Sequence, residues 1–288
     1  MNDEIPEWIK TGQFDREAYE KTAEMLKRQR LNTVCVEANC PNRYECFSKG
    51  TATFMILGSR CTRNCLYCNV MPGKPEPVDG EEPGRIAEAA KEMGIRHAVI
   101  TCVTRDDLDD GGASQFIKVI EALKPVGCTV EVLISDLDGN WDALESVVKA
   151  KPDVLNHNIE VVEDMYPEMR PRGDYKQSLD LLESVKVLDP SMITKSGLMV
   201  GLGETMEQIE KTLSDLREAR VDMITVGQYL RPSPGHLAVR RYYTQEEFAM
   251  IKAKALGLGF KTVESGPLVR SSYHAKECYE AVAAAGND

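Results

Sequence analysis

Six of the nine cysteines fall into two groups of three within the segment from Thr33 to Asn69. The first group is Cys35, Cys40 and Cys46, and the second group is Cys61, Cys65 and Cys68. A tetrahedral thiolate site takes four ligands, and so does a 4Fe-4S cluster. Each group is therefore one protein ligand short, which leaves one coordination position open for something else.

The second group follows a strand-like run and reads Cys61-Thr-Arg-Asn-Cys65-Leu-Tyr-Cys68. Three soft thiolates on one loop can hold three irons of a cubane cluster, and its fourth iron is then open to a chelating substrate. The alternative is a structural zinc site in a protein without enzymatic activity. Zinc needs a fourth nearby Cys or His, and this loop contains no His, so the zinc alternative is the weaker one.

Composition narrows the function classes further. The 288 residues include 35 basic and 46 acidic side chains, and the formal charge of -11 disfavours nucleic acid as a partner. The sequence has no apolar run that predicts a membrane span. The amino terminus resembles neither a signal nor a transit peptide, so a cytoplasmic location is expected. Nine cysteines then indicate metal or redox chemistry rather than disulfides.

Short β-type runs alternate with segments of helical spacing from Thr51 onward. The predicted strands are 54–57, 98–100, 130–134, 154–155, 198–200, 223–226 and 260–263. Helical spacing covers 116–123, 179–185 and 206–216, and a polar helix is predicted over 14–30. Such alternation predicts parallel strands covered by helices.

Polar residues cluster directly after nearly every predicted strand, which is typical of the active-site rim of a β/α barrel. The fold class predicted is α/β, a partial (β/α) TIM-type barrel over residues 51–264. An amino-terminal arm, 1–50, carries the first cysteines, and a carboxyl-terminal tail covers 265–288. A doubly wound open sheet is the alternative, since it also places a site at the carboxyl ends of its strands.

Several stretches resemble a known family. The C-x3-C-x2-C loop, with Tyr67 before its last Cys, resembles the radical S-adenosylmethionine (SAM) superfamily. The first cysteine group, Gly50–Gly58, Asn156–Glu160, Lys195–Thr205 and Arg270–Ala275 together resemble the lipoyl synthase family within it. The resemblance covers roughly the whole chain past the first thirty residues.

The resemblance implies two 4Fe-4S clusters. Cys61, Cys65 and Cys68 would hold the cluster whose open iron binds SAM, which is cleaved to methionine and a 5'-deoxyadenosyl radical. The first group would hold an auxiliary cluster, with the Ser272 hydroxyl as its fourth ligand. That cluster would donate two sulfurs to an octanoyl chain on a lysine of a carrier protein. Without the resemblance, Ser272 would be read as a hydroxyl capping a turn.

Further residues after the predicted strands are candidates for binding SAM. They are Thr104, Arg105, Asp106, Asn156, Asn158, Glu160, Arg170 and Lys195. Each also has an ordinary structural interpretation, as a solvated charge, a helix cap or a surface ion pair. The Gly201-Leu-Gly203 pair lacks the third glycine of a dinucleotide fingerprint, which argues against a Rossmann fold.

The resemblance also implies partners: an octanoylated H protein or E2 lipoyl domain, and a low-potential electron donor such as ferredoxin or flavodoxin. Neither nucleic acid nor a membrane is expected. Another two-cluster radical enzyme, such as a tRNA methylthiotransferase, is a rival interpretation. It would predict an added basic RNA-binding domain, which neither the charge nor the length supplies.

Overall fold

The computed structural model describes residues 5–9 and 14–285. The chain divides into two compact units, each described by itself. The amino-terminal unit comprises residues 11–64 and 69–155, and the carboxyl-terminal unit comprises residues 1–10, 65–68 and 156–288. Within the described ranges, no helix is both long and apolar enough to cross a membrane.

Four strands form the sheet of the amino-terminal unit, in the order β1-β2-β5-β6. Their bounds are β1 Asn32–Thr33, β2 Thr53–Ile56, β5 His97–Cys102 and β6 Thr129–Leu133. β1 is antiparallel to β2, and the others are parallel. Phe54 lies opposite Ile100 and Ile100 opposite Val132, and all three are fully buried. These apolar neighbours fix the register, because a one-residue slip would turn them to the other face.

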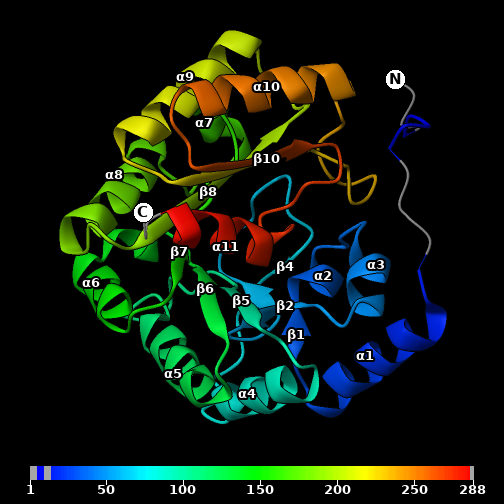
Figure 1. The fold of residues 1–288 in the computed structure, drawn as a ribbon, viewed down its shortest axis with the longest axis vertical. Helices are drawn as coiled ribbons and strands as arrows, with labels where there is room; N and C mark the ends of the chain where they lie inside the picture. Colours follow the sequence, from blue (N-terminus) through cyan, green and yellow to red (C-terminus); the bar gives the residue numbers. More distant parts are fainter. Residues whose placement is uncertain (1–4, 10–13, 286–288) are drawn as a thin grey trace. The chain divides into compact units, whose positions relative to one another are not determined.

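Helices of the amino-terminal unit connect and cover these strands (Figure 1). They are α1 Arg16–Arg28, α2 Val34–Glu37, α3 Arg43–Ser48, α4 Glu82–Glu92, α5 Ala113–Leu123 and α6 Trp141–Lys149. α1 begins where the Asp15 carboxylate accepts from the Ala18 backbone N–H. It packs on α3 through Tyr19, whose ring stacks on Tyr44 and Phe47 at centroid distances of 5.2 and 5.7 Å. The arm is thereby held by aromatic packing.

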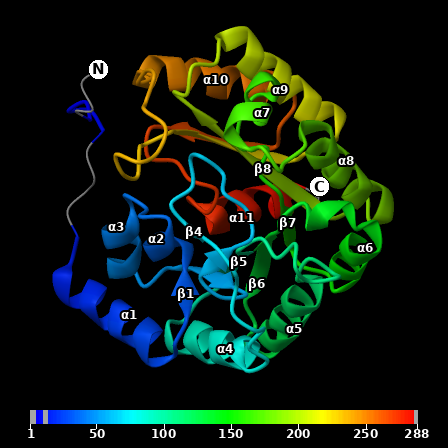
Figure 2. The ribbon, with the colours of Figure 1, turned by 180° about the vertical axis from the view of Figure 1, so that it is seen from behind.

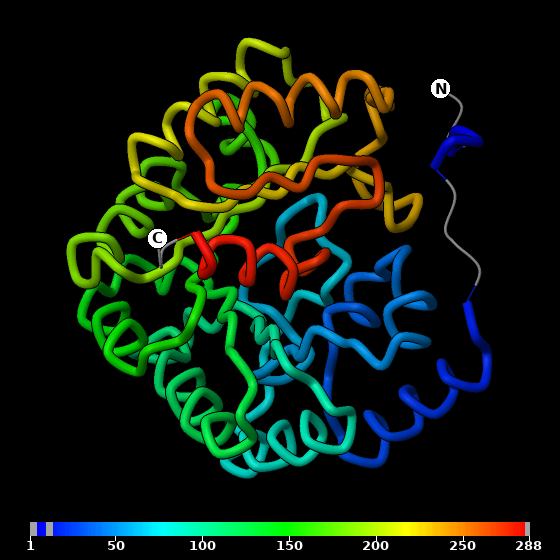
Figure 3. The backbone as a smooth tube through the Cα atoms, in the orientation of Figure 1, coloured from blue at the N-terminus to red at the C-terminus, as the bar shows by residue number. Residues whose placement is uncertain are grey.

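The carboxyl-terminal unit has three parallel strands in the order β8-β9-β10, seen from the other side in Figure 2. These are β8 Ile193–Val200, β9 Met223–Gln228 and β10 Thr262–Gly266. Its helices are α7 Tyr166–Met169, α8 Tyr175–Leu188, α9 Met206–Glu218, α10 Gln245–Gly257 and α11 Ala275–Ala285. Figure 3 allows the chain to be followed through them. β7, Val154–Asn156, lies where the two units meet in sequence.

All seven predicted strands are present, with ends shifted by no more than three residues, except that β8 starts five residues before the predicted 198. The first stops at Ile56 because Leu57 has φ +71°, a conformation that ends a strand. The helices predicted over 14–30, 116–123, 179–185 and 206–216 correspond to α1, α5, α8 and α9. The division at residues 50 and 264 stays a prediction.

Candidate active site

The first cysteine group lies entirely in the amino-terminal unit. Cys35 is in α2, Cys46 is in α3, and Cys40 is between them, where its N–H donates to the Cys35 carbonyl at 3.1 Å. Burial raises the pKa of the Cys35 thiol to about 12, against a hydrogen bond from Thr53, and the charges of Cys40 and Cys46 raise it further. Burial and Cys40 likewise raise the pKa of Cys46. The short segment from α2 to α3 therefore carries all three cysteines within one unit.

The second group begins with Cys61, which is in β3, Arg60–Cys61. β3 pairs with β4, Met71–Pro72, and the Gly73 N–H donates to the Cys61 carbonyl at 2.9 Å. The backbone N–H of Arg63 points at the Cys61 sulfur, at 3.4 Å. The Cys61 backbone is thus fixed, and its half-buried sulfur already accepts one hydrogen bond.

Cys65 and Cys68 belong to the carboxyl-terminal unit. The backbone N–H of Cys68 donates a hydrogen bond to the Cys65 carbonyl at 3.0 Å. The Leu66 N–H donates to the Met169 carbonyl at 3.0 Å. The imidazole Nε2 of His236 lies 3.1 Å from the Cys68 carbonyl, and its Nδ1 lies 2.9 Å from the Ser233 hydroxyl. The loop around His236 therefore supports this cysteine pair.

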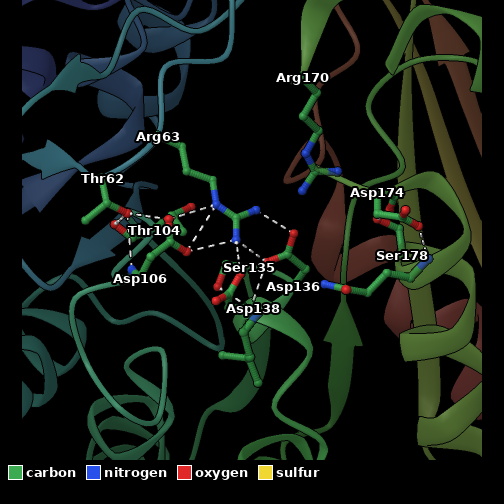
Figure 4. A network of polar contacts seen from close by, with 12 residues as sticks. Thr62, Arg63, Thr104, Asp106, Ser135, Asp136, Asp138, Arg170, Asp174 and Ser178 are labelled. Atoms are coloured by element: carbon green, nitrogen blue, oxygen red, sulfur yellow. Dashed lines mark hydrogen bonds and ion pairs between the residues drawn. The ribbon is translucent and has the colours of Figure 1, made fainter. Parts of the chain in front are cut away.

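Arg63 is the centre of a buried ionic network in the amino-terminal unit (Figure 4). Its side chain is only 4% exposed. Its Nη2 donates to Asp106 Oδ1 at 2.8 Å, and its Nη1 donates to Asp136 Oδ2 at 2.5 Å. Burial opposes the charge of Arg63, but the hydrogen bonds with these carboxylates hold its pKa above the usual range. A permanently charged guanidinium is therefore locked between two carboxylates.

The candidates Thr104, Arg105 and Asp106 lie in or beside this ionic network. The Thr104 carbonyl accepts from the Thr62 backbone N–H at 3.1 Å, and both Asp106 oxygens accept from Arg63. The Arg105 guanidinium donates to Asp107 and to the Leu57 carbonyl. The charged groups of Arg105 and Asp106 thus already have partners inside the protein. A direct contact with SAM stays a prediction for all three residues.

A second polar group is built in the carboxyl-terminal unit around Asn158. Its Nδ2 donates to Glu160 Oε1 at 3.2 Å and to the Ser271 hydroxyl at 2.6 Å. Its Oδ1 is buried and accepts no hydrogen bond from the described protein groups. A Cβ on Gly197 would lie 2.7 Å from that oxygen, so glycine leaves the space that Oδ1 needs. A buried orphan acceptor is where a ligand donor fits.

Charged side chains surround this amide. Burial raises the pKa of the Glu160 carboxyl, against the opposing charge of Arg170. Arg170 is buried and donates to the Asn158 carbonyl at 3.4 Å and to the Tyr166 hydroxyl at 3.1 Å. The Tyr67 pKa is raised, first by burial and then by Glu160. Figure 4 labels Arg170 near the start of α8. The predicted Asn158, Glu160 and Arg170 therefore do come together.

Asn156 and Lys195 are fully buried, at the end of β7 and within β8. The Lys195 carbonyl accepts from the His157 N–H at 3.1 Å, which aligns the segment after β7 with β8. Ser272 lies in the turn closed by the bond from the Tyr273 N–H to the Arg270 carbonyl at 2.8 Å. The SAM-binding and cluster-binding roles of these three residues stay predictions.

Arg63 and Ser271 were missed as site residues by sequence reasoning. Arg63 is one of two residues inside the C-x3-C spacing that can hydrogen-bond through a charged or amide side chain, and that position was the available signal. Ser271 adjoins Ser272 in the motif that carried the resemblance. Their partners lie 43, 73 and 113 residues away in sequence, so spacing alone could not reveal them.

Thiolates are the protein ligands of iron-sulfur clusters, and each cysteine group supplies three of them. Across the parts of the chain that the structure describes, no three His, Cys, Asp or Glu side chains converge as ligands of one metal ion. No disulfide links any of the nine cysteines, all of which lie in the described residues. A cubane takes one thiolate for each iron, so its ligands surround a cluster and need not meet at a point. Three thiols on one short segment, as Cys35, Cys40 and Cys46 are, suit that arrangement.

Comparison with known proteins defines the class. The model of the Radical SAM superfamily matches residues 55–216. Methylornithine synthase has a similar structure, with a TM-score of 0.56 and 15% identity over 86% of this chain and 70% of that one. Streptococcus suis SuiB bound to S-adenosylmethionine gives 0.57 and 13%, over 88% and 62%. The fold is that of the radical SAM enzymes, and the chain is a member of that superfamily.

Relatives at much higher identity define the family. A lipoyl synthase of Caldanaerobacter subterraneus subsp. tengcongensis is 55% identical over 94% of this chain and 95% of that protein. One of Rubrobacter xylanophilus is 53% identical over 94% and 85%. The chain belongs to the lipoyl synthase family. The predicted fold class, enzyme class and cofactors, SAM with two 4Fe-4S clusters, are thereby confirmed.

Proposed function

We propose that the chain inserts two sulfur atoms into an octanoyl group carried on a lysine of a lipoyl carrier protein. The observation that carries the proposal is the placement of Cys35, Cys40 and Cys46 on the short α2–α3 segment of one unit, a thiol group additional to the C-x3-C-x2-C loop. Family membership supports the same reaction. When bound, the cofactors supply a 5'-deoxyadenosyl radical from SAM and sulfur from the auxiliary cluster.

The protein's own residues hold and orient these groups. Cys61, Cys65 and Cys68 would hold the SAM cluster, and Cys35, Cys40, Cys46 and Ser272 the auxiliary cluster. The Asn158 Oδ1 is an acceptor unpaired among the described residues, near the half-buried Glu160 and the buried Arg170, which suits the hydroxyl, amine and carboxylate groups of SAM. A buried binding site excludes water, which protects a carbon radical from side reactions.

Anaerobic reconstitution tests the proposal. We expect about eight irons per chain, from two cubanes. Reduction should then yield 5'-deoxyadenosine, and turnover with an octanoyl-lysine peptide should add two sulfurs. Oxidation of the two new thiols to the dithiolane removes two hydrogens, so mass spectrometry identifies the product. Stoichiometric zinc with no SAM cleavage would falsify the proposal.

The carrier and the electron donor follow from this chemistry. We infer that an octanoylated H protein or E2 lipoyl domain is the substrate, and that ferredoxin or flavodoxin supplies the electrons. We also infer a cytoplasmic location, which nine cysteines outside disulfides support, because reducing compartments disfavour disulfides. Turnover with each purified carrier and each reductant, and cell fractionation, test these points. A carrier that stays unmodified with every reductant is not the substrate.

A further inference from the structure

Arg63 stands two residues after Cys61 and two before Cys65, and its buried guanidinium joins two carboxylates. We propose that Arg63 is a positioning residue, which clamps the loop carrying Cys61 to the ends of β5 and β6 and so retains the SAM-binding cluster. The inference rests on the proposed function, in which Cys61 is a cluster ligand. Arg63 itself has no part in the chemistry.

The guanidinium grips two different loops at once. Its Nε and Nη2 donate to Asp106, in the loop after β5, at 3.1 and 2.8 Å. Its Nη1 and Nη2 donate to Asp136, in the loop after β6, at 2.5 and 2.7 Å. Figure 4 shows the side chain between the two carboxylates. A planar fork can pair with two carboxylates in this way, and a lysine ammonium cannot.

Both anchors are themselves fixed. The Asp136 side chain is 1% exposed and also accepts from the Asp138 backbone N–H at 3.1 Å. The Asp106 backbone N–H donates to the Thr62 hydroxyl at 3.1 Å, and that hydroxyl also lies 2.9 Å from Asp106 Oδ2. The Thr62 N–H donates to the Thr104 carbonyl at 3.1 Å. Side chain and backbone thus bind the loop to the same support.

This clamp reaches Cys61 directly. The Arg63 backbone N–H lies 3.4 Å from the Cys61 sulfur, so the conformation that buries the guanidinium also aims this donor. Hydrogen bonds to ligand sulfurs and the groups behind them orient metal ligands, and their loss typically costs 10- to 100-fold in metal affinity. Arg63 therefore acts on the cluster through Cys61 and not through contact with substrate.

Iron retention is the decisive measurement, because it does not depend on turnover. Changing Cys35, Cys40 and Cys46 to Ala leaves one cluster and about four irons per chain. In that background we compare Arg63→Gln, Arg63→Lys and Asp106→Asn for the rate of iron loss to a ferrous chelator. The electron paramagnetic resonance spectrum of the reduced cluster, with and without SAM, is recorded in parallel. Arg85→Gln is the control, since Arg85 lies in α4 of the same unit and pairs with Asp79 instead of Asp106 or Asp136.

We expect Arg63→Gln and Arg63→Lys each to release iron about 10- to 100-fold faster than the control. If iron is still lost rapidly when lysine replaces Arg63, a positive charge alone is not sufficient, and the paired hydrogen bonds to Asp106 and Asp136 are required. Release at the control rate in both variants, with unchanged spectra, overturns the inference. If Arg63→Gln does not fold by circular dichroism, Arg63→Lys and Asp106→Asn decide by the same rates. A parent protein with Arg63 intact that takes up no iron contradicts the proposed function itself.

Discussion

At the scale of single residues, Asn158 has an amide nitrogen that is hydrogen-bonded and an amide oxygen that is not, within the part of the chain that the structure describes. Its amide nitrogen donates to Glu160 and Ser271, while its Oδ1 is buried without a donor among the described protein groups. An unmade hydrogen bond of this kind costs about 1–3 kcal/mol. Such a cost is retained where a ligand removes it, and the raised pKa of nearby Glu160 also marks a desolvated site.

Replacing Asn158 by Leu should weaken SAM binding about tenfold or more. The side chain keeps its approximate shape but loses the orphan acceptor and both donated bonds, and about 1.4 kcal/mol corresponds to a factor of ten. Equilibrium dialysis of SAM against the reconstituted protein measures this. Ser146→Ala is the control, because the Ser146 hydroxyl bonds only within α6. Equal affinities in both variants would remove Asn158 from the SAM site.

Ser272→Ala should separate the two halves of the reaction. The hydroxyl oxygen would be a hard donor among soft thiolates, so its loss alters the auxiliary cluster alone. We expect 5'-deoxyadenosine to form at close to the normal rate while the doubly sulfurated product falls at least about tenfold. Both products are quantified from one reaction by mass spectrometry. Normal lipoyl formation would show that Ser272 is not a ligand.

At the scale of elements, the loop between β8 and α9 pairs its backbone N–H groups with one of its own side chains. Backbone N–H groups of Gly201, Leu202 and Gly203 donate to the buried Glu204 carboxylate at 2.5, 2.9 and 3.1 Å. Three amides aimed at one point form an anion-binding nest, and here a side chain of the same loop occupies it. The loop therefore holds its shape with its own hydrogen bonds, and α9 starts from the capping box of Thr205 and Gln208.

Glu204→Ala should destabilise the carboxyl-terminal unit by about 2–5 kcal/mol, because it leaves buried N–H groups unpaired. Urea unfolding followed by circular dichroism gives the change. Glu207→Ala, at an exposed position on the first turn of α9, should change stability by less than about 1 kcal/mol. A similar small effect for both would mean that the nest is not structural.

The helices and strands are the features that the sequence predicts best. The strands around Ile100 and Val132 were recognisable because short apolar runs bounded by polar loops suit a buried parallel sheet. The Cys61 loop was recognisable because its ligands are neighbours in sequence. The supports were not, since Arg63 pairs with Asp136 only through the fold. Local patterns cannot specify which distant loops meet, and these supporting contacts are all of that kind.

At the scale of the whole molecule, stability depends on a charge cluster around the buried Asp222, distant in sequence from the two cysteine groups. The Asp222 carboxylate accepts from Lys186 and from the Thr194 N–H, and pairs with Lys261 at 2.9 Å. Burial opposes ionisation of Asp222, but the hydrogen bonds from these donors outweigh burial and hold the pKa of Asp222 below its ordinary value. A depressed carboxyl pKa stabilises the fold above the unfolded value, near about 3.9.

Acid should therefore remove this contribution. As the pH falls below about 4 and through the lower folded pKa of Asp222, protonation breaks the bonds with both lysines and the stability is lost. Asp222→Asn should lower stability at pH 7 by about 3–5 kcal/mol, since it leaves Lys186 buried without its carboxylate. The same substitution should also make the free energy of unfolding depend less on pH in acid. Thermal unfolding between pH 3 and 7 measures both, and an unchanged acid slope would assign it to other carboxylates.

The division into units also sets an order of events during protein synthesis. Cys35, Cys40 and Cys46, with the aromatic packing of α1 on α3, belong to a unit whose last residue is 155. That unit is translated before Ser272, and domains generally fold as units as they emerge. The three thiols are therefore in place for more than a hundred residues of elongation before the serine exists. Under the proposed ligation, iron or sulfide that reaches a nascent chain meets the three thiols before Ser272 has been made.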